Sequence, residues 1–149
     1  MHDPDWEAQL ANGPDAIRGV LRRFRPWSAH RILRPFVESY QVVADALERH
    51  EERAVDESRF LAACLSLGNQ YRLQHRIRSA ESISKVLFST GLRLARNRRL
   101  IDDDTAGDKE ASPELRDRRA RFAAEIRDVI RRINAIDALV ASRRAGLID

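Results

Sequence analysis

The stretch Glu81–Asp104, ESISKVLFSTGLRLARNRRLIDDD, carries the pattern that decides the predicted fold. Its apolar residues recur three and four positions apart, which is the spacing of one face of an α-helix. We predict a helix capped by Ser79, with Gly91 inside it. Glycine within a helix costs about 1 kcal/mol relative to alanine, so we expect Gly91 to allow close packing against a neighbouring helix. The inward-facing residues are expected to be Ile83, Val86, Leu87, Thr90, Leu94 and Leu100, with Phe88 beside them.

The end of this stretch is rich in arginine and runs into acidic residues. The arginines are Arg93, Arg96, Arg98 and Arg99. They crowd the last turns of the predicted helix, where cations complement the helix dipole. The segment Asp102–Glu110, DDDTAGDKE, is too polar to pack and is predicted to be a loop. Because the dipole and the acidic loop account for these arginines, we expect no ligand there.

Three more long helices are predicted, each with apolar residues at helical spacing. Their expected spans are Ala29–His50, Ser58–His75 and Ser112–Arg144, and their expected N-caps are Ser28, Asp56 and Ser112. Serine and aspartate suit this position because their side chains accept a hydrogen bond from a free backbone N–H. Pro35 interrupts the first pattern, so that helix either kinks or begins there. Pro113 favours a helix start directly after Ser112.

Residues 1–149 are expected to form a single domain of the all-α class. The chain has only six glycines and five prolines, most of them near predicted segment ends, which favours long helices over sheet. Gly13, Pro14 and Pro26 delimit one or two short N-terminal helices. We therefore predict one helical bundle of four main helices plus these short pieces.

The last predicted helix carries an apolar seam with alternating steps of four and three. Its members are Phe122, Ile126, Val129, Ile133, Ile136 and Val140. Such a seam suits a terminal helix that closes a bundle, and it also suits a coiled-coil homodimer. Ile130 and Leu139 broaden the apolar face, which favours the bundle. A homodimer through the seam is the alternative.

The chain is basic, and its positive charge comes almost wholly from 25 arginines, with only two lysines. A net charge of +4 favours anionic partners, although codon bias in a GC-rich genome also explains the arginine excess. Six arginines fall between Ala16 and Val37 without an acidic residue: Arg18, Arg22, Arg23, Arg25, Arg31 and Arg34. They indicate either a solvated basic face or a surface for anions. Lipid headgroup phosphates are a better candidate for such a surface than nucleic acid.

No catalytic, metal or cofactor site is predicted. The sequence has no Gly-rich phosphate loop, no Cys/His metal spacing and no nucleophile elbow. Cys64 lies among apolar residues and is expected to be a buried hydrophobe rather than a nucleophile. His30 and His50 are expected at the surface without partners, and we interpret the proximity of His50 to Asp56 as coincidence.

The N-terminus is acidic and lacks an apolar core segment, so we expect no secretory signal. The longest uncharged run, Phe60–Tyr71, has 12 residues, whereas a membrane span needs about 18 or more. We therefore expect a cytoplasmic location, either soluble or at a membrane surface.

Two segments resemble the C-terminal region of the bacterial glycerol-3-phosphate 1-O-acyltransferases. They are LRPFVESYQVVADAL, Leu33–Leu47, and ESISKVLFSTGLRLARNRRLI, residues 81–101. The residues that carry the resemblance are Tyr40, Val86, Leu87, Phe88 and Ser89. It covers roughly Ile17–Arg132, and the segments occur in the family's order.

The resemblance implies a role in membrane phospholipid synthesis at the inner face of the cell membrane. The family transfers an acyl group from acyl-CoA or acyl carrier protein to the sn-1 hydroxyl of glycerol 3-phosphate. Its catalysis rests on a His-x-x-x-x-Asp motif in an upstream α/β domain, and this sequence has no such motif. The resemblance therefore implies a non-catalytic helical portion, either a fragment or half of a split enzyme, with a catalytic domain on another chain as its partner.

The alternative hypothesis is a small Arg-rich helical module that binds an anionic membrane surface or nucleic acid. Nucleic acid is the less favoured partner, because no helix-turn-helix spacing with a basic recognition face is evident. The acidic loop and the scattered arginines also argue against it.

Overall fold

The structure, a computed structural model, describes residues 29–101 and 110–146, and every long element in them is helical. In chain order these are α3 (Ala29–Glu48), α4 (Glu57–Leu73), the 3-10 turn η1 (Ala80–Ser82), α5 (Lys85–Asn97) and α6 (Pro113–Arg144). The described residues form no β-sheet, which confirms the all-α prediction. The expected short N-terminal helices, the Ser28 cap and most of the acidic loop lie outside the described residues.

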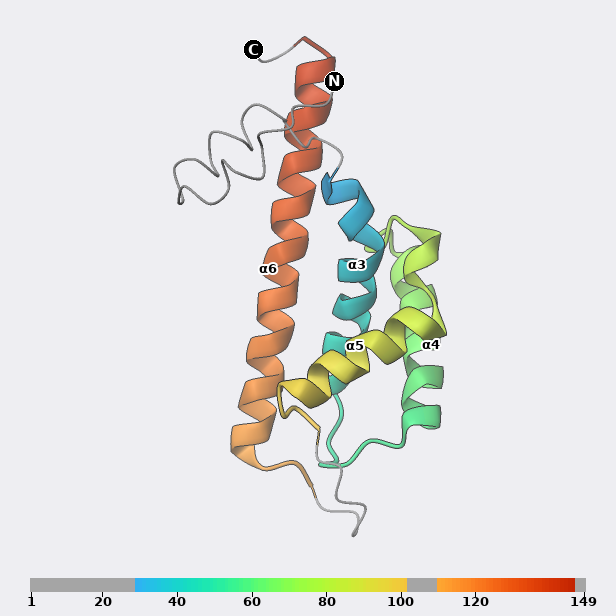
Figure 1. Cartoon of the computed structure of the whole chain (residues 1–149), viewed down its shortest axis with the longest axis vertical. Coiled ribbons are helices and arrows are strands. Elements are labelled where there is room, and N and C mark those ends of the chain that lie inside the picture. Colours follow the sequence, from blue (N-terminus) through green and yellow to red (C-terminus); the bar gives the residue numbers. More distant parts are fainter. Residues whose placement is uncertain (1–28, 102–109, 147–149) are drawn as a thin grey trace, which may run out of the picture.

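Helix α3 is the centre of the described fold, because each of the other helices packs against it. Figure 1 shows α3 and the long α6 side by side in opposite directions, with α4 on the other flank of α3. Helix α5 crosses α3 obliquely and reaches from α4 toward the start of α6. The described helices thus form a bundle around α3, and α4 and α5 also contact each other.

The predicted helix starts at Asp56 and Ser112 are confirmed. The Asp56 carboxylate accepts a hydrogen bond of 2.8 Å from the backbone N–H of Arg59. The Ser112 hydroxyl accepts one of 3.2 Å from the N–H of Leu115, and Pro113 occupies the first turn. Each side chain satisfies an N–H that has no partner within its helix. Pro35 lies inside α3 without ending it.

A continuous hydrophobic core fills the space between the helices. Its most buried members are Val42, Val43, Ala44, Leu47, Cys64, Tyr71, Phe88, Leu92, Ala95, Phe122 and Ala123. Cys64 is fully buried, and burial raises the pKa of its thiol to about 12. A thiol with that pKa is almost wholly protonated near neutral pH and is therefore a poor nucleophile. The prediction of Cys64 as a buried hydrophobe is confirmed.

The predicted inner face of the 81–104 helix is correct only in part: Ile83 and Leu94 pack against the core, but Val86 does not. Helix α5 begins at Lys85, six residues after the expected cap Ser79, and it buries Phe88, Gly91, Leu92 and Ala95. Of the residues expected to face inward, Val86 is 74% exposed, whereas Ile83, Leu87, Thr90 and Leu94 are half-buried and only Leu100 is buried.

Glu38 of α3 explains why the helix does not start at Ser79. Its buried carboxylate accepts hydrogen bonds from the backbone N–H groups of Arg78 (3.1 Å) and Ser79 (3.0 Å). The Ser82 hydroxyl donates a third bond of 2.7 Å to the same carboxylate. These bonds hold residues 78–82 as a turn against α3, so the helix starts only after them.

Candidate functional site

A buried polar cluster joins the first turns of α3 to the last turns of α6. His30 Nε2 lies 2.6 Å from Asp137 Oδ1, across 107 positions of sequence. Arg34 donates to the other oxygen of Asp137 and to Asn134 Oδ1 at 3.0 Å. The expectation that His30 lies at the surface without a partner is wrong: its side chain is only 5% exposed. The partner stands on a different helix, so no local pattern could reveal it.

Asp137 remains ionised in this cluster. Burial raises the pKa of the carboxyl, but the hydrogen bond to His30 and the charge of Arg34 outweigh burial, and the pKa falls below its usual value. The cluster therefore contains a histidine and a carboxylate in contact, as a general-base pair would. It holds them in the helix interface, where Arg34 also binds the carboxylate.

A second buried carboxylate, Asp45 on α3, ties three helices together. The Tyr71 hydroxyl of α4 donates to it at 2.7 Å, and Arg127 of α6 donates to its other oxygen at 2.8 and 3.0 Å. Burial, followed by the bond to Asp45, raises the pKa of Tyr71. The guanidinium of Arg76 stacks over the Tyr71 ring at 3.8 Å. Each polar group of this network has a structural partner.

Arg119 on α6 is a buried cation that the sequence did not single out. Its guanidinium donates to four backbone carbonyls, those of His50 (2.7 Å), Glu52 (2.9 Å), Leu100 (2.9 Å) and Arg53 (3.2 Å). Burial lowers its pKa to about 10, and the charges of two neighbouring arginines add to the effect, so Arg119 stays charged at neutral pH. It fastens the loop after α3 and the end of the α5 region to α6.

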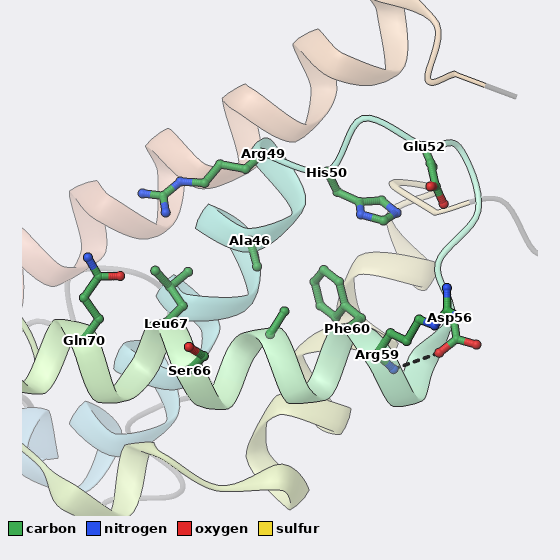
Figure 2. A pocket seen from close by; sticks show the side chains of 11 residues that line it. Ala46, Arg49, His50, Glu52, Asp56, Arg59, Phe60, Ser66, Leu67 and Gln70 are labelled. Atoms are coloured by element: carbon green, nitrogen blue, oxygen red, sulfur yellow. Dashed lines mark hydrogen bonds between the residues drawn. The ribbon is translucent and has the colours of Figure 1, made fainter. Parts of the chain in front are cut away.

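A groove of about 490 Å³ runs between the end of α3 and helix α4. Figure 2 shows Ala46, Phe60 and Leu67 in its middle, with Arg49 toward one end and Asp56 toward the other. His50 also lines the groove. Its Nε2 lies 2.8 Å from the carbonyl oxygen of Ala54, so the partner of His50 is this backbone oxygen rather than the Asp56 carboxylate. In the part of the chain that the structure describes, no group of three His, Cys, Asp or Glu side chains could hold a metal ion.

Three large apolar side chains are exposed on the first turns of α3. They are Ile32, Leu33 and Phe36, and we call them the α3 apolar face. Their exposed fractions are 69%, 54% and 43%. Leu33 and Phe36 continue the stripe that, one and two turns later, packs against α5 through Tyr40 and Val43. Among the described residues, the α3 apolar face is thus an exposed extension of an internal packing surface.

Of the six arginines of the predicted anion surface, the structure describes Arg31 and Arg34. Arg31 is exposed at the start of α3. Arg34 is buried and bound to Glu38 (3.2 Å), Asn134 and Asp137, so its charge is already matched within the protein. The other four predicted residues, Arg18, Arg22, Arg23 and Arg25, lie outside the described residues.

The apolar seam of α6 lies partly inside the bundle. Phe122, Ile133 and Val140 are buried, Ile126 packs against the core, and Val129 and Ile136 are 40% and 38% exposed. Ile130, which broadens the seam, is buried as well. A large part of this face therefore contacts the chain's own helices, chiefly α3.

None of the helices within residues 29–101 and 110–146 has the length and apolar character needed to span a bilayer.

Comparison with known proteins identifies a family for most of the chain. The sequence model described as "Glycerol-3-phosphate acyltransferase C-terminal region" matches residues 7–104. Two relatives, each named "Putative acyltransferase plsB1", from Mycobacterium bovis and Mycobacterium tuberculosis, are 49% identical over 111 residues. Those residues are 74% of this chain but 17% of each relative, so the chain spans only a small part of their length. No solved structure matches it.

The matched region contains both segments that carry the resemblance seen in the sequence, Leu33–Leu47 and residues 81–101. It includes α3, α4 and α5 and ends before α6 begins at Pro113. The α3 apolar face, Glu38 and the turn at residues 78–82 that Glu38 holds all lie within the matched residues.

Proposed function

Because this chain belongs to the family of glycerol-3-phosphate acyltransferase C-terminal regions, we propose that it is the non-catalytic helical portion of such an enzyme. The complete activity is transfer of an acyl group from acyl-CoA or acyl carrier protein to the sn-1 hydroxyl of glycerol 3-phosphate, for phospholipid synthesis. The catalytic domain is supplied outside this chain, on a separate polypeptide or in a longer form of the protein.

The observation that carries the proposal is that, within residues 29–101 and 110–146, the buried charged side chains Arg34, Glu38, Asp45 and Arg119 each bind other parts of the protein. Acyl transfer to a hydroxyl needs a base within reach of the substrate and a site for the oxyanion. In the His30–Asp137 pair the carboxylate is also bound by Arg34, and Glu38 accepts from three donors around residues 78–82 in addition to Arg34. These groups stabilise the bundle, and catalysis by them would require breaking it.

The α3 apolar face is the docking surface of this portion. Three neighbouring large apolar side chains in one and a half helical turns are costly to leave in water, and such patches mark interaction sites. The relatives have most of their sequence outside the matched region, and that remaining sequence is the partner for the α3 apolar face. The α3 apolar face therefore packs against the remainder of the acyltransferase.

Arg31 and the arginines at 18, 22, 23 and 25 form the part of this portion that faces anionic lipid headgroups. Arginine forks bind phosphate oxygens in pairs, and the absence of acidic residues between Ala16 and Val37 leaves their charge unopposed along the sequence. The protein is then peripheral at the cytoplasmic face of the cell membrane.

A chimera tests the proposal. The 111 matched residues of the M. tuberculosis relative are replaced by those of this chain, and acyl transfer from acyl-CoA to glycerol 3-phosphate is measured. We expect the chimera to keep the activity of the unaltered relative, a deletion of the same residues to lose it, and the purified chain alone to show none. Turnover by the purified chain alone, or a folded but inactive chimera, would refute the proposal.

A further inference from the structure

A basic hollow of about 510 Å³ lies at the end of α4, lined by Arg72, His75, Ile77 and Arg78. No acidic side chain lines it among the described residues. We propose that this hollow binds a phosphate group. The residues of the hollow differ from the arginines of the predicted anion surface, and the proposal does not rest on the role in acyl transfer.

The cations of the hollow are largely free to bind a ligand. Within the described part of the chain, neither the Arg72 guanidinium nor the His75 ring makes an ion pair or a side-chain hydrogen bond. Arg78 is 60% exposed and approaches Asp137 only to 3.6 Å, while that carboxylate is already bound by His30 and Arg34. Elsewhere, arginines such as Arg119 and Arg127 are held by close protein partners.

The turn that ends α4 places His75 in the lining of the hollow. Helix α4 ends in a turn in which His75 N–H donates to Arg72 O (3.0 Å) and Arg76 N–H donates to Tyr71 O (2.9 Å). In this type of helix end the residue at the position of His75 has a positive φ and is usually glycine. His75 has φ 57° and so adopts this left-handed conformation with a side chain, which costs free energy relative to glycine. A histidine there is consistent with a use for its ring, which lines the hollow.

The chemistry of the hollow fits phosphate better than a carboxylate. Two guanidinium groups and an imidazole offer more donors than one carboxylate can accept, whereas a phosphate presents three or four oxygens. The volume exceeds that of a bare phosphate, so the group can be part of a larger molecule.

The ligand has two possible sources, a soluble phosphate ester and a lipid headgroup, and two measurements on the purified chain separate them. Inorganic phosphate is titrated at constant ionic strength against chloride, with the amide signals of residues 72–78 followed by NMR. Co-sedimentation then compares vesicles of phosphatidylglycerol with vesicles of phosphatidylcholine. Phosphate-dependent shifts at residues 72–78 without vesicle binding identify a soluble ligand, whereas vesicle binding that depends on Arg72 and Arg78 identifies a headgroup.

The double variant Arg72→Gln/Arg78→Gln is compared with Arg93→Gln/Arg118→Gln, which removes the same charge from exposed positions elsewhere. We expect the first pair to weaken phosphate or vesicle binding at least tenfold and the second to change it less than twofold. His75→Gly should raise the melting temperature and still lower affinity several-fold. Equal losses in both double variants, or neither phosphate shifts nor selective vesicle binding, would overturn the proposal. A His75→Gly protein with unchanged affinity would remove His75 from the site.

Discussion

Gly91 of α5 lies so close to Val43 of α3 that a Cβ atom at position 91 would stand 3.0 Å from Val43 Cγ2. The same atom would lie 3.2 Å from Tyr40 Cδ1. Val43 is fully buried and β-branched, so it has little freedom to move aside. The crossing of α5 over the central helix therefore depends on the missing side chain, as the sequence predicted for Gly91.

Replacing Gly91 by alanine should destabilise the protein. Overpacking costs about 1–3 kcal/mol, and the better helix propensity of alanine offsets about 1 kcal/mol of it. Gly68→Ala is the matched control in α4, because its Cβ would meet Phe88 Cζ at an ordinary 3.4 Å. Urea unfolding should show Gly91→Ala less stable than the parent protein and Gly68→Ala equally or more stable. A stabilised Gly91→Ala protein would show that the contact between α5 and α3 can accommodate a Cβ atom at position 91.

Asp137→Asn should loosen the contact between the start of α3 and the end of α6. The neutral amide cannot balance the charge of Arg34, and hydrogen bonds to charged groups contribute about 1.5–3 kcal/mol each. Asp128→Asn is the control, because Asp128 pairs only with Arg131 and Arg132 on the surface of the same helix. Exposed pairs of this kind contribute less than about 1 kcal/mol. Thermal unfolding that gives equal losses for both variants would refute the structural role of the cluster.

Acid should remove the contribution of Asp137. Its pKa is lower in the folded protein than the value of about 3.9 expected for the unfolded chain. A lowered carboxyl pKa stabilises the folded state at every pH above the unfolded value, and this stabilisation is lost as the pH falls through the folded value. The difference in unfolding free energy between the parent protein and Asp137→Asn should be constant above about pH 5 and should shrink below about pH 4. A difference that grew on acidification would contradict this assignment.

Arg119→Leu should be among the most destabilising single changes in the described helices. It leaves four backbone carbonyls without their donor, and each buried unsatisfied group costs about 1–3 kcal/mol. The neighbouring Arg118 is exposed, so Arg118→Leu should change stability by less than about 0.5 kcal/mol. Hydrogen exchange should in addition show faster exchange at residues 50–54 in the first variant only. Unaltered exchange there would mean that other contacts hold the loop.

Local chemistry predicted the helices well. Asp56 and Ser112–Pro113 mark their helix starts because a cap acts within one turn of the chain. The burial of Cys64 likewise followed from its apolar neighbours. The family resemblance was also readable, since it rests on contiguous segments that fall within the matched residues 7–104.

Contacts between residues far apart in the sequence were not predicted. The helix was predicted to start too early because Glu38, about forty positions earlier, holds residues 78–82 as a turn. His30 was expected at the surface because Asp137 is 107 positions away. Arg119 gave no signal, since a buried arginine that binds carbonyls resembles any other arginine of an Arg-rich helix. Long-range polar contacts of this kind have no periodicity that a sequence pattern could reveal.

The measurement that most directly tests the account is acyl transfer by the chimera with charges placed on the α3 apolar face. Leu33→Glu/Phe36→Glu should abolish transfer from acyl-CoA to glycerol 3-phosphate, because the helical portion can no longer pack on the catalytic domain. Val86→Glu/Asn97→Glu, at two exposed positions of α5, adds the same charge and should leave transfer unchanged. Circular dichroism should show both proteins folded. Equal activity of the two folded variants would contradict the assignment of the α3 apolar face as the docking surface.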